Sequence, residues 1–208
     1  MSVDGRVLLS SPVRALWCNV ITPRAYKENG VAKGDPTFDA TFVLTPEQLA
    51  EVLKVAKAVA NEQWPGKALK ELKLPFKKAE VAIAIAIEKK KDSSIYTPGT
   101  YLLEARTKKQ PILSWLEGGK VVEQRIENAA VVKQKFYHGC WTVPRLNFAI
   151  KTKNGDGIKA YLDNLFWYKD GEKIGGISSA EMFKGYIGSV STEDPTGSST
   201  DLDDEIPF

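Results

Sequence analysis

The sequence predicts a mainly β domain with one long α-helix and a flexible acidic tail. Several runs of apolar and β-branched residues have the length and alternation of strands, whereas one stretch has the spacing of an amphipathic helix. Residues 188–208 are rich in Ser, Thr, Gly and acidic residues, and this composition is too poor in apolar groups to offset the entropy of ordering the segment. We therefore expect a folded domain over residues 1–187 and a flexible tail over residues 188–208.

The charge is distributed unevenly along the 208-residue chain, whose length suits a single domain with a substantial core. The chain carries 29 Lys and Arg against 26 Asp and Glu, and six of these acidic residues, but no Lys or Arg, lie from Gly185 onward. The remainder has 29 basic and 20 acidic residues, a balance of +9. Such a basic body suggests a polyanionic partner, although a mild excess of charge also serves solubility alone.

Strands are expected where apolar residues alternate or run together. Residues 13–21 have apolar side chains on both faces, which is typical of a strand covered on both sides. In residues 81–87 β-branched side chains alternate with Ala, as in a strand pressed closely against a neighbour. The expected strands are 13–21, 37–44, 81–87 and 101–107, with weaker candidates at 112–115 and 121–126.

The helix is predicted from Thr45 to Gln63. The Thr45 hydroxyl can cap the Gln48 amide, and Pro46 occupies the first helical position, where its missing N–H costs nothing. The apolar residues that follow recur on one helical face: Leu49, Val52, Leu53, Ala56, Val59 and Ala60. We expect the helix to end near Trp64 and a shorter helical turn to follow at residues 68–72.

The clearest antiparallel unit lies near the end of the folded part. Residues 140–151 and 158–169 are long strand-like runs, joined by a turn rich in residues that tolerate positive φ. Two basic segments, residues 22–36 and 108–111, are expected to be loops, and a last short helix is possible from Ser178 or Ser179.

The sequence argues against several kinds of catalytic site. His138 is the only histidine, so neither a catalytic triad nor a paired-histidine metal site can be assembled around it without unusual partners. Cys140 lies close to it in sequence, but structural zinc needs four ligands and Cys18 is the only other thiol. We expect no enzymatic activity, no metal and no cofactor, and we expect both cysteines to be buried thiols.

No segment predicts insertion into a membrane or export. The longest apolar run, residues 81–87, is far shorter than a membrane span requires. The N-terminal residues lack the basic-then-apolar order of a secretory signal. We therefore expect a cytoplasmic protein without a membrane partner.

Aromatic residues interleaved with basic ones suggest a surface for single-stranded nucleic acid. Unpaired bases stack on flat rings, and cations follow the phosphates. Arg14 and Trp17 form one such pair near the N-terminus. Aromatic strand residues are also common in protein cores, so the pattern is informative as a whole rather than residue by residue.

A family resemblance rests on the stretch from Phe136 to Phe183. The residues that carry it begin one position earlier and are Lys135, Phe136, Tyr137, His138, Gly139, Cys140, Trp141, Thr142, Val143, Leu146, Asn147, Phe148, Asn154, Gly155, Gly157, Ile158, Leu162, Asp163, Asn164, Leu165, Phe166, Trp167, Lys169, Asp170, Gly171, Gly175 and Gly176. This stretch resembles phage-encoded single-stranded DNA-binding proteins of a family long listed as a domain of unknown function, relatives of the T7-type helix-destabilising protein. His138 stands where these relatives commonly have a proline.

The resemblance implies an oligonucleotide/oligosaccharide-binding (OB) fold, here an elaborated, five-stranded antiparallel barrel with one main helix. It also implies sequence-nonspecific binding of single-stranded DNA in phage replication or recombination, in the cytoplasm of an infected bacterium. For base stacking we expect Tyr137 and Trp141 first, then Tyr26, Tyr101 and Trp115. For phosphate binding we expect Lys27, Lys33, Arg106, Lys108, Lys109, Arg145 and Lys153.

A second resemblance lies in the final residues, Asp203, Asp204, Glu205, Ile206, Pro207 and Phe208. They are similar to the acidic tip of bacterial single-stranded DNA-binding proteins. The similarity implies a peptide that replication and repair proteins bind, such as a polymerase, helicase or primase, with the aromatic side chain as anchor. A merely solubilising tail is the alternative, although solubility needs no terminal aromatic residue.

Two other functions remain open from the sequence. An annealing or recombination protein would share the barrel and differ in promoting duplex formation. A metal-dependent nuclease would need a carboxylate site that no sequence pattern reveals. The oligomeric state is open as well.

Overall fold

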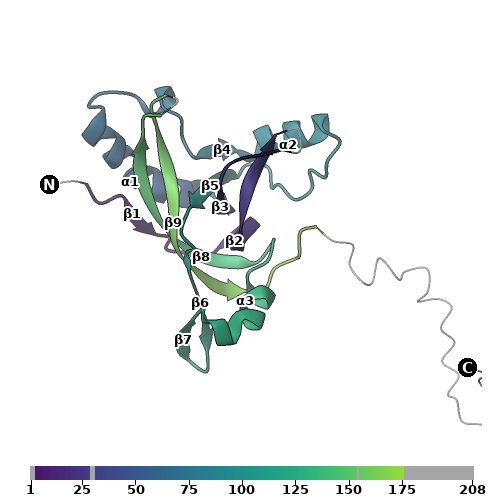
Figure 1. Ribbon diagram of the computed structural model, residues 1–208. Coiled ribbons are helices and arrows are strands. Elements are labelled where there is room, and N and C mark those ends of the chain that lie inside the picture. Colours follow the sequence, from purple (N-terminus) through teal and green to yellow (C-terminus); the bar gives the residue numbers. More distant parts are fainter. Residues whose placement is uncertain (1–2, 29–30, 154, 176–208) are drawn as a thin grey trace, which may run out of the picture. The chain divides into compact units, whose positions relative to one another are not determined.

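The computed structural model describes residues 3–28, 31–153 and 155–175 (Figure 1). The strands are β1 (Arg6–Leu8), β2 (Val13–Glu28), β3 (Val31–Leu44), β4 (Phe76–Lys78), β5 (Tyr101–Thr107), β6 (Ile112–Glu117), β7 (Lys120–Glu123), β8 (Trp141–Lys151) and β9 (Gly157–Lys169). The helices are α1 (Pro46–Gln63), α2 (Ala79–Glu88) and α3 (Ala129–Lys135), with short 3-10 turns at Leu69–Glu71 and Ile126–Asn128.

Five strands close into a barrel in the order β2, β3, β5, β9, β8 and back to β2. Four of the five junctions are antiparallel, whereas β5 and β9 meet in parallel at Ala105 and Ala160. Closure leaves no free edge within the ring. The structure confirms the mainly β class and the OB-fold, with one parallel junction in a barrel that we expected to be antiparallel.

The alternation of β3 shows how sequence places side chains inside the barrel. Phe38, Ala40, Phe42 and Leu44 are buried, and the residues between them are partly exposed. Successive side chains of a strand point to opposite faces, so this pattern gives the strand one core face and one outer face. Burial of a side chain such as Phe42 stabilises the fold by roughly 1.5–3 kcal/mol.

Helix α1 matches the sequence prediction. The Thr45 hydroxyl accepts the amide hydrogen of Gln48 at 3.3 Å, and the Gln48 side-chain oxygen accepts that of Thr45 at 2.9 Å. Its buried face, which includes Val52 and Ala56, packs into the main hydrophobic core. The expected turn after the helix is present as the 3-10 turn Leu69–Glu71.

The prediction of a strand at residues 81–87 is wrong, because this segment lies in α2. The short run of Ala and β-branched residues fits both periods, but Ala79, Ala82 and Ala86 share a helical face and are buried. Their small side chains allow close packing, and Ala82 joins a second small cluster with Leu16, Leu102 and Ile174 on the outside of the barrel. The bulkier Val81, Ile85 and Ile87 are exposed.

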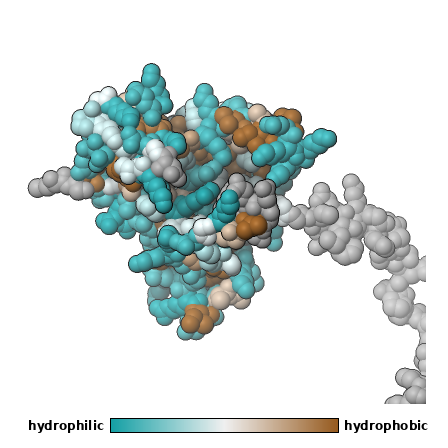
Figure 2. Space-filling view, turned by 45° about the horizontal axis from the view of Figure 1, so that its top comes forward, coloured by the Kyte–Doolittle hydropathy of each residue, from teal (hydrophilic) through white to brown (hydrophobic). Residues whose placement is uncertain are grey.

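The space-filling view shows apolar side chains at several places on a largely hydrophilic face. Among these places are α2 and the tip of the β6–β7 hairpin (Figure 2). The residues concerned include Leu116 and Val121, cross-strand partners on that hairpin that are 55% and 64% exposed.

The prediction of a loop over residues 22–36 is also wrong. Strands β2 and β3 continue as a two-stranded ribbon, in which Arg24 pairs with Thr37 and Tyr26 with Lys33, with irregularities in register. The sequence of this segment is polar and contains glycine, so it lacks the alternation of apolar and polar residues that predicts a strand. Backbone pairing does not require such a face.

The remaining strand predictions agree with the structure: β5, the β6–β7 region and the β8–β9 hairpin all form. The possible helix at Ser178 or Ser179, the domain boundary near residue 187 and the acidic tail lie outside the described residues. Within the described part of the chain, no helix is both long and apolar enough to cross a membrane.

Candidate nucleic-acid interface

The outer face of β2, β3 and β5 carries two rows of polar and aromatic side chains. Register pairing aligns Trp17, Thr41 and Glu104 in one row. In the next row it aligns Asn19, Asp39 and Arg106. The neighbouring Cys18, Ala40 and Ala105 point inward and are buried, so the two rows form the outer surface of the barrel wall.

Three connected hollows lie along this wall, and together we call them the groove. Their volumes are about 310, 790 and 840 Å³. The smallest contains Trp17 and Thr41, the second runs beside the β2–β3 ribbon at Arg24 and Lys33, and the largest reaches β9. Arg106 lines all three hollows. The groove can therefore take an extended polymer, with one arginine at its centre.

Hydrogen bonds fix the polar side chains on the groove floor. Asn19 Nδ2 donates to Asp39 Oδ2 at 3.0 Å, and Arg24 Nη1 donates to Asn19 Oδ1 at 2.8 Å. Glu104 is held by cations instead, because Lys77 Nζ lies 2.6 Å from Oε1 and Arg106 Nη2 lies 3.9 Å from Oε2. The floor presents oriented donors and acceptors rather than a uniform positive charge.

Cations surround the largest hollow. Its lining includes Arg106 and five lysines, Lys73, Lys108, Lys109, Lys151 and Lys159. Lys108 Nζ lies 2.6 Å from Asp35 Oδ2, and this exposed pair lowers the pKa of Asp35 and raises the pKa of Lys108. Clustered cations along a groove attract a phosphate backbone, with an affinity that falls as salt rises.

Aromatic rings stand near the two ends of the groove. Trp17 is partly exposed on β2 and packs edge-on against His138, with ring centroids 5.5 Å apart. Tyr161 is 36% exposed on β9 and lines the largest hollow. Such rings can stack on unpaired bases of any kind, because every base has a flat aromatic face.

His138 is neutral in this arrangement. Its Nδ1 accepts the amide hydrogen of Cys18 at 2.9 Å, so the ring proton of the neutral form is on Nε2. Burial lowers the pKa of His138, the nearby Arg24 guanidinium lowers it further, and the Asp39 carboxylate opposes them. The histidine supports the backbone of β2 beside Trp17.

Four of the expected phosphate-binding residues line the groove: Arg106, Lys108, Lys109 and Lys33. Tyr26 and Lys27 lie in the β2–β3 ribbon by their backbone, but their side chains are outside the described part of the structure. Arg145 on β8 and Lys153 in the β8–β9 turn are exposed and are not among the residues that line the three hollows.

The expectation that Trp115 is exposed for stacking is wrong. Its side chain is 1% exposed and belongs to the main core, because β6 turns this face inward against β9. Sequence reasoning selected the ring because basic residues precede it, and a strand aromatic is often a core residue.

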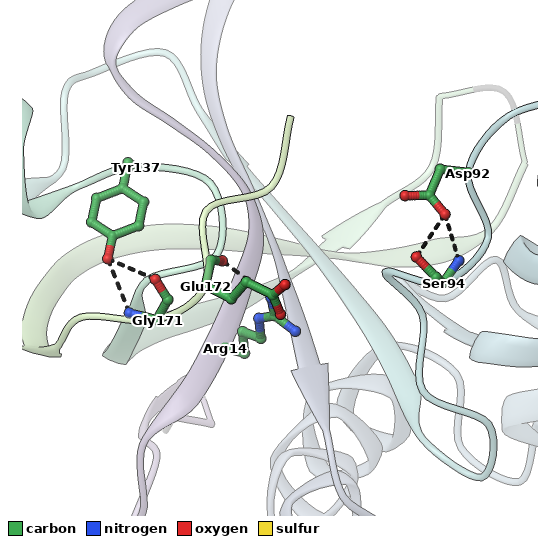
Figure 3. Close-up of polar contacts among 6 residues, drawn as sticks. All are labelled: Arg14, Asp92, Ser94, Tyr137, Gly171 and Glu172. Atoms are coloured by element: carbon green, nitrogen blue, oxygen red, sulfur yellow. Dashed lines mark hydrogen bonds and ion pairs between the residues drawn. The ribbon is translucent and has the colours of Figure 1, made fainter. Parts of the chain in front are cut away.

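Three other expected stacking residues, Tyr137, Trp141 and Tyr101, are not among the residues that line the groove. Tyr137 packs against the core, and its hydroxyl accepts the Gly171 amide hydrogen at 3.0 Å and lies 2.9 Å from Gly171 O (Figure 3). The same hydroxyl lies 2.9 Å from Asp170 Oδ1. Burial raises the pKa of Tyr137. The same segment is tied to β2, because Arg14 Nη2 donates to Glu172 O at 3.1 Å (Figure 3). Tyr137 thus anchors the segment that follows β9.

Trp141 and Tyr101 are half-buried at strand ends. The ammonium of Lys169 lies 5.3 Å from the centroid of the Trp141 ring, a cation–π contact. Tyr101 packs against the main core and pairs with Leu44 and Lys78 through its backbone. Neither lines the three hollows.

The groove also contains residues that the sequence prediction did not select, among them Asn19, Arg24, Asp39 and Tyr161. A signal was present for two of them: Asn19 and Asp39 are polar residues within otherwise apolar strand runs. Only the register of β2 against β3 brings them together.

The two cysteines are buried, as the sequence predicts. The hydrogen bond between their thiols raises the pKa of Cys18 and lowers that of Cys140. Among the residues that the structure describes, no group of three or more His, Cys, Asp or Glu is placed to hold a metal ion.

Comparison with solved structures finds phage proteins. The single-stranded DNA-binding protein from bacteriophage Enc34 in complex with ssDNA is 19% identical with a TM-score of 0.59, over 82% of this chain and 90% of that chain. A C-terminal truncation of that protein is 20% identical with a TM-score of 0.58, over 82% and 88%. The gp2.5 protein of bacteriophage T7, also a single-stranded DNA-binding protein, is 12% identical with a TM-score of 0.47, over 95% and 100%. At the identities of the Enc34 structures the likeness shows a shared fold.

A search among curated proteins found no match. A family model described as "Enterobacter phage Enc34, ssDNA-binding protein" matches residues 6–194, which is most of the chain. This match confirms the phage family that the motifs between Phe136 and Phe183 indicate. The chain therefore belongs to the family of the single-stranded DNA-binding protein of Enterobacter phage Enc34.

Proposed function

We propose that this protein binds single-stranded DNA in the groove across β2, β3 and β5, without strong sequence preference. The observation that carries the proposal is the groove itself, in which Arg106 lines all three hollows and lysines surround the largest. The family membership supports the same ligand. Cations bind the phosphates, and Trp17 and Tyr161 provide flat surfaces for bases.

The composition of the groove floor favours a single strand over a duplex. The floor consists of side chains from three adjacent strands, and its aromatic rings can stack only on bases that are not already paired and stacked. Stacking and phosphate contacts are available to every base, so affinity does not depend strongly on sequence. The function is therefore protection of single-stranded DNA during phage replication or recombination, in the cytoplasm of the host.

The experiment is a tryptophan-fluorescence titration of the full chain with an oligothymidine strand and with a duplex of the same length, each at two salt concentrations. We expect quenching by the single strand, weaker binding to the duplex, and an affinity that falls as salt rises. No fluorescence change and no retention of the strand in a gel-shift assay would contradict the proposal.

We further propose that the acidic segment Asp203–Phe208 recruits replication proteins of the host. Its support is chemical: carboxylates next to Ile206, Pro207 and Phe208 provide both charge and an apolar anchor for a basic pocket. Purified polymerase, helicase and primase should each be tested for binding to the full chain and to a variant lacking Asp201–Phe208. At least one should bind only the full chain, and equal binding of both forms would contradict recruitment while leaving DNA binding intact.

A further inference from the structure

The groove floor is unusual for a nucleic-acid interface because it contains carboxylates. Asp39 and Glu104 lie on the same outer face as Arg106. A carboxylate repels phosphates, and within a groove of reduced dielectric this repulsion is stronger than in water. We therefore expect a bound strand to place its phosphates along Arg106 and the lysines and to turn a base edge toward the carboxylates.

The two carboxylates differ in what holds them. Both oxygens of Glu104 lie within ion-pairing distance of cations, those of Lys77 and Arg106. Among the residues that the structure describes, Asp39 accepts a side-chain hydrogen bond only from a neutral amide, that of Asn19, through Oδ2. A carboxylate can accept about four hydrogen bonds, so Asp39 keeps acceptor capacity toward the groove.

The orientation of Asp39 is also fixed. Its backbone is paired on both sides, with Asn19 on β2 and Arg106 on β5. Asn19 is in turn oriented by Arg24, whose guanidinium donates to Asn19 Oδ1 at 2.8 Å. The result is a preorganised acceptor that lines two of the three hollows.

We propose that Asp39 accepts a hydrogen bond from the amino group of one base of the bound strand, and so favours cytosine, adenine and guanine over thymine and uracil at that position. This inference rests on the proposed function of the groove. Cytosine presents an amino donor at the position where thymine and uracil present a carbonyl oxygen. That oxygen would face the Asp39 carboxylate, which can only accept hydrogen bonds. The preference is local, because the remaining contacts are to phosphates and ring faces.

The test compares binding of oligodeoxycytidine with binding of oligodeoxyuridine. They have the same backbone and similar rings without a methyl group, and they differ in the groups on the base edge. Affinities of the full chain should be measured at slightly alkaline pH, where cytosine is unprotonated, and at several salt concentrations. We expect binding to the cytidine strand to be about fivefold tighter, as one charge-assisted hydrogen bond supports.

Asp39→Asn is the diagnostic variant, because the amide is nearly isosteric and can both donate and accept. It should bring the ratio of the two affinities close to one. Asp39→Ser replaces the carboxylate with a smaller, neutral hydroxyl and should have the same effect on the ratio of the two affinities. The matched control is Asp163→Asn, which removes the same charge in the β9 part of the groove lining. It should tighten binding to both strands alike and keep their ratio.

The outcomes separate this inference from the function on which it rests. If the unaltered protein binds neither strand, the proposed function fails. If it binds both strands equally, or if Asp39→Asn leaves an existing preference unchanged, the protein still binds single-stranded DNA but Asp39 does not read the base, and the inference is overturned. Circular dichroism of each variant checks that the barrel remains folded.

Discussion

Arg106 on β5 is the register partner of Asp39 on β3, and both side chains line the groove. This pairing places a cation that lines all three hollows beside an anion that lines two of them. A phosphate and a base edge can therefore be bound next to each other. The two residues are far apart in sequence, and only the pairing of β3 with β5 makes them neighbours.

Arg106 is expected to contribute directly to DNA affinity. Arg106→Gln should weaken binding to single-stranded DNA roughly tenfold, because it removes a charge-assisted contact with phosphate. It should also reduce the slope of log affinity against log salt by about one. Lys54→Gln, on the exposed side of α1, is the control of equal charge, and it should change neither quantity appreciably. If the two variants weaken DNA binding equally, the affinity depends on the net charge of the protein and not on a specific contact of Arg106.

Asp35 is expected to compete with DNA for Lys108. The pair is exposed on both sides, with side chains 74% and 72% accessible, so it contributes little to stability. Asp35→Asn should therefore tighten DNA binding at low salt without changing the melting temperature. Asp92→Asn removes the same charge from a residue that caps a turn at Ser94 and does not line the groove (Figure 3). A gain in affinity with Asp92→Asn as large as that with Asp35→Asn would contradict a specific competition.

Trp17, rather than Trp115, should report DNA binding by fluorescence. Trp17 lines the groove, whereas Trp115 is buried in the core. In a titration with oligothymidine, Trp17→Phe should lose most of the quenching, and Trp115→Phe should retain it. Trp17→Ala should also weaken binding by about 1–3 kcal/mol, as loss of a stacking ring does. If Trp17→Phe still shows the quenching, a tryptophan other than Trp17 contacts the DNA.

The cap of α1 should matter for stability and not for binding. Thr45→Ala removes the hydroxyl that accepts the Gln48 amide hydrogen, and this loss typically costs about 1 kcal/mol of unfolding free energy. Urea denaturation measures the change, and the affinity for DNA should stay the same. Thr152→Ala, at an exposed position after β8 that caps no helix, is the control and should leave stability within error.

Acidification should destabilise the fold through His138. Because burial lowers the pKa of His138 in the folded state, the unfolded chain takes up the proton more readily, near the ordinary value of 6.5. The contribution of His138 to the free energy of unfolding is therefore complete above pH 6.5. It is lost as the pH falls from 6.5 toward the lower pKa that His138 has in the folded state. Protonation also removes the acceptor for the Cys18 amide hydrogen. His138→Gln should show a flatter dependence of unfolding free energy on pH, and an unchanged dependence would assign the titration to other groups.

The sequence by itself determined the elements whose signals are local. The Thr45, Pro46 and Gln48 cap predicts the start of α1, and the alternation along the β8–β9 hairpin predicts a paired, half-buried unit. The motifs between Phe136 and Phe183 indicated the family and, with it, the barrel. Cations such as Arg106, Lys108 and Lys109 could be selected because charge in a loop or at a strand end is visible without a structure.

Tertiary structure alone decided which side chains face the groove. Trp115 and Trp17 are both strand tryptophans near basic residues, yet one is in the core and the other lines the groove, because that outcome depends on which face each strand turns to its neighbours. Residues 81–87 satisfy the strand period and the helix period alike, and packing of the alanine face against the barrel selects the helix. The row of Asn19, Asp39 and Arg106 exists only through pairing between strands, which no local pattern encodes.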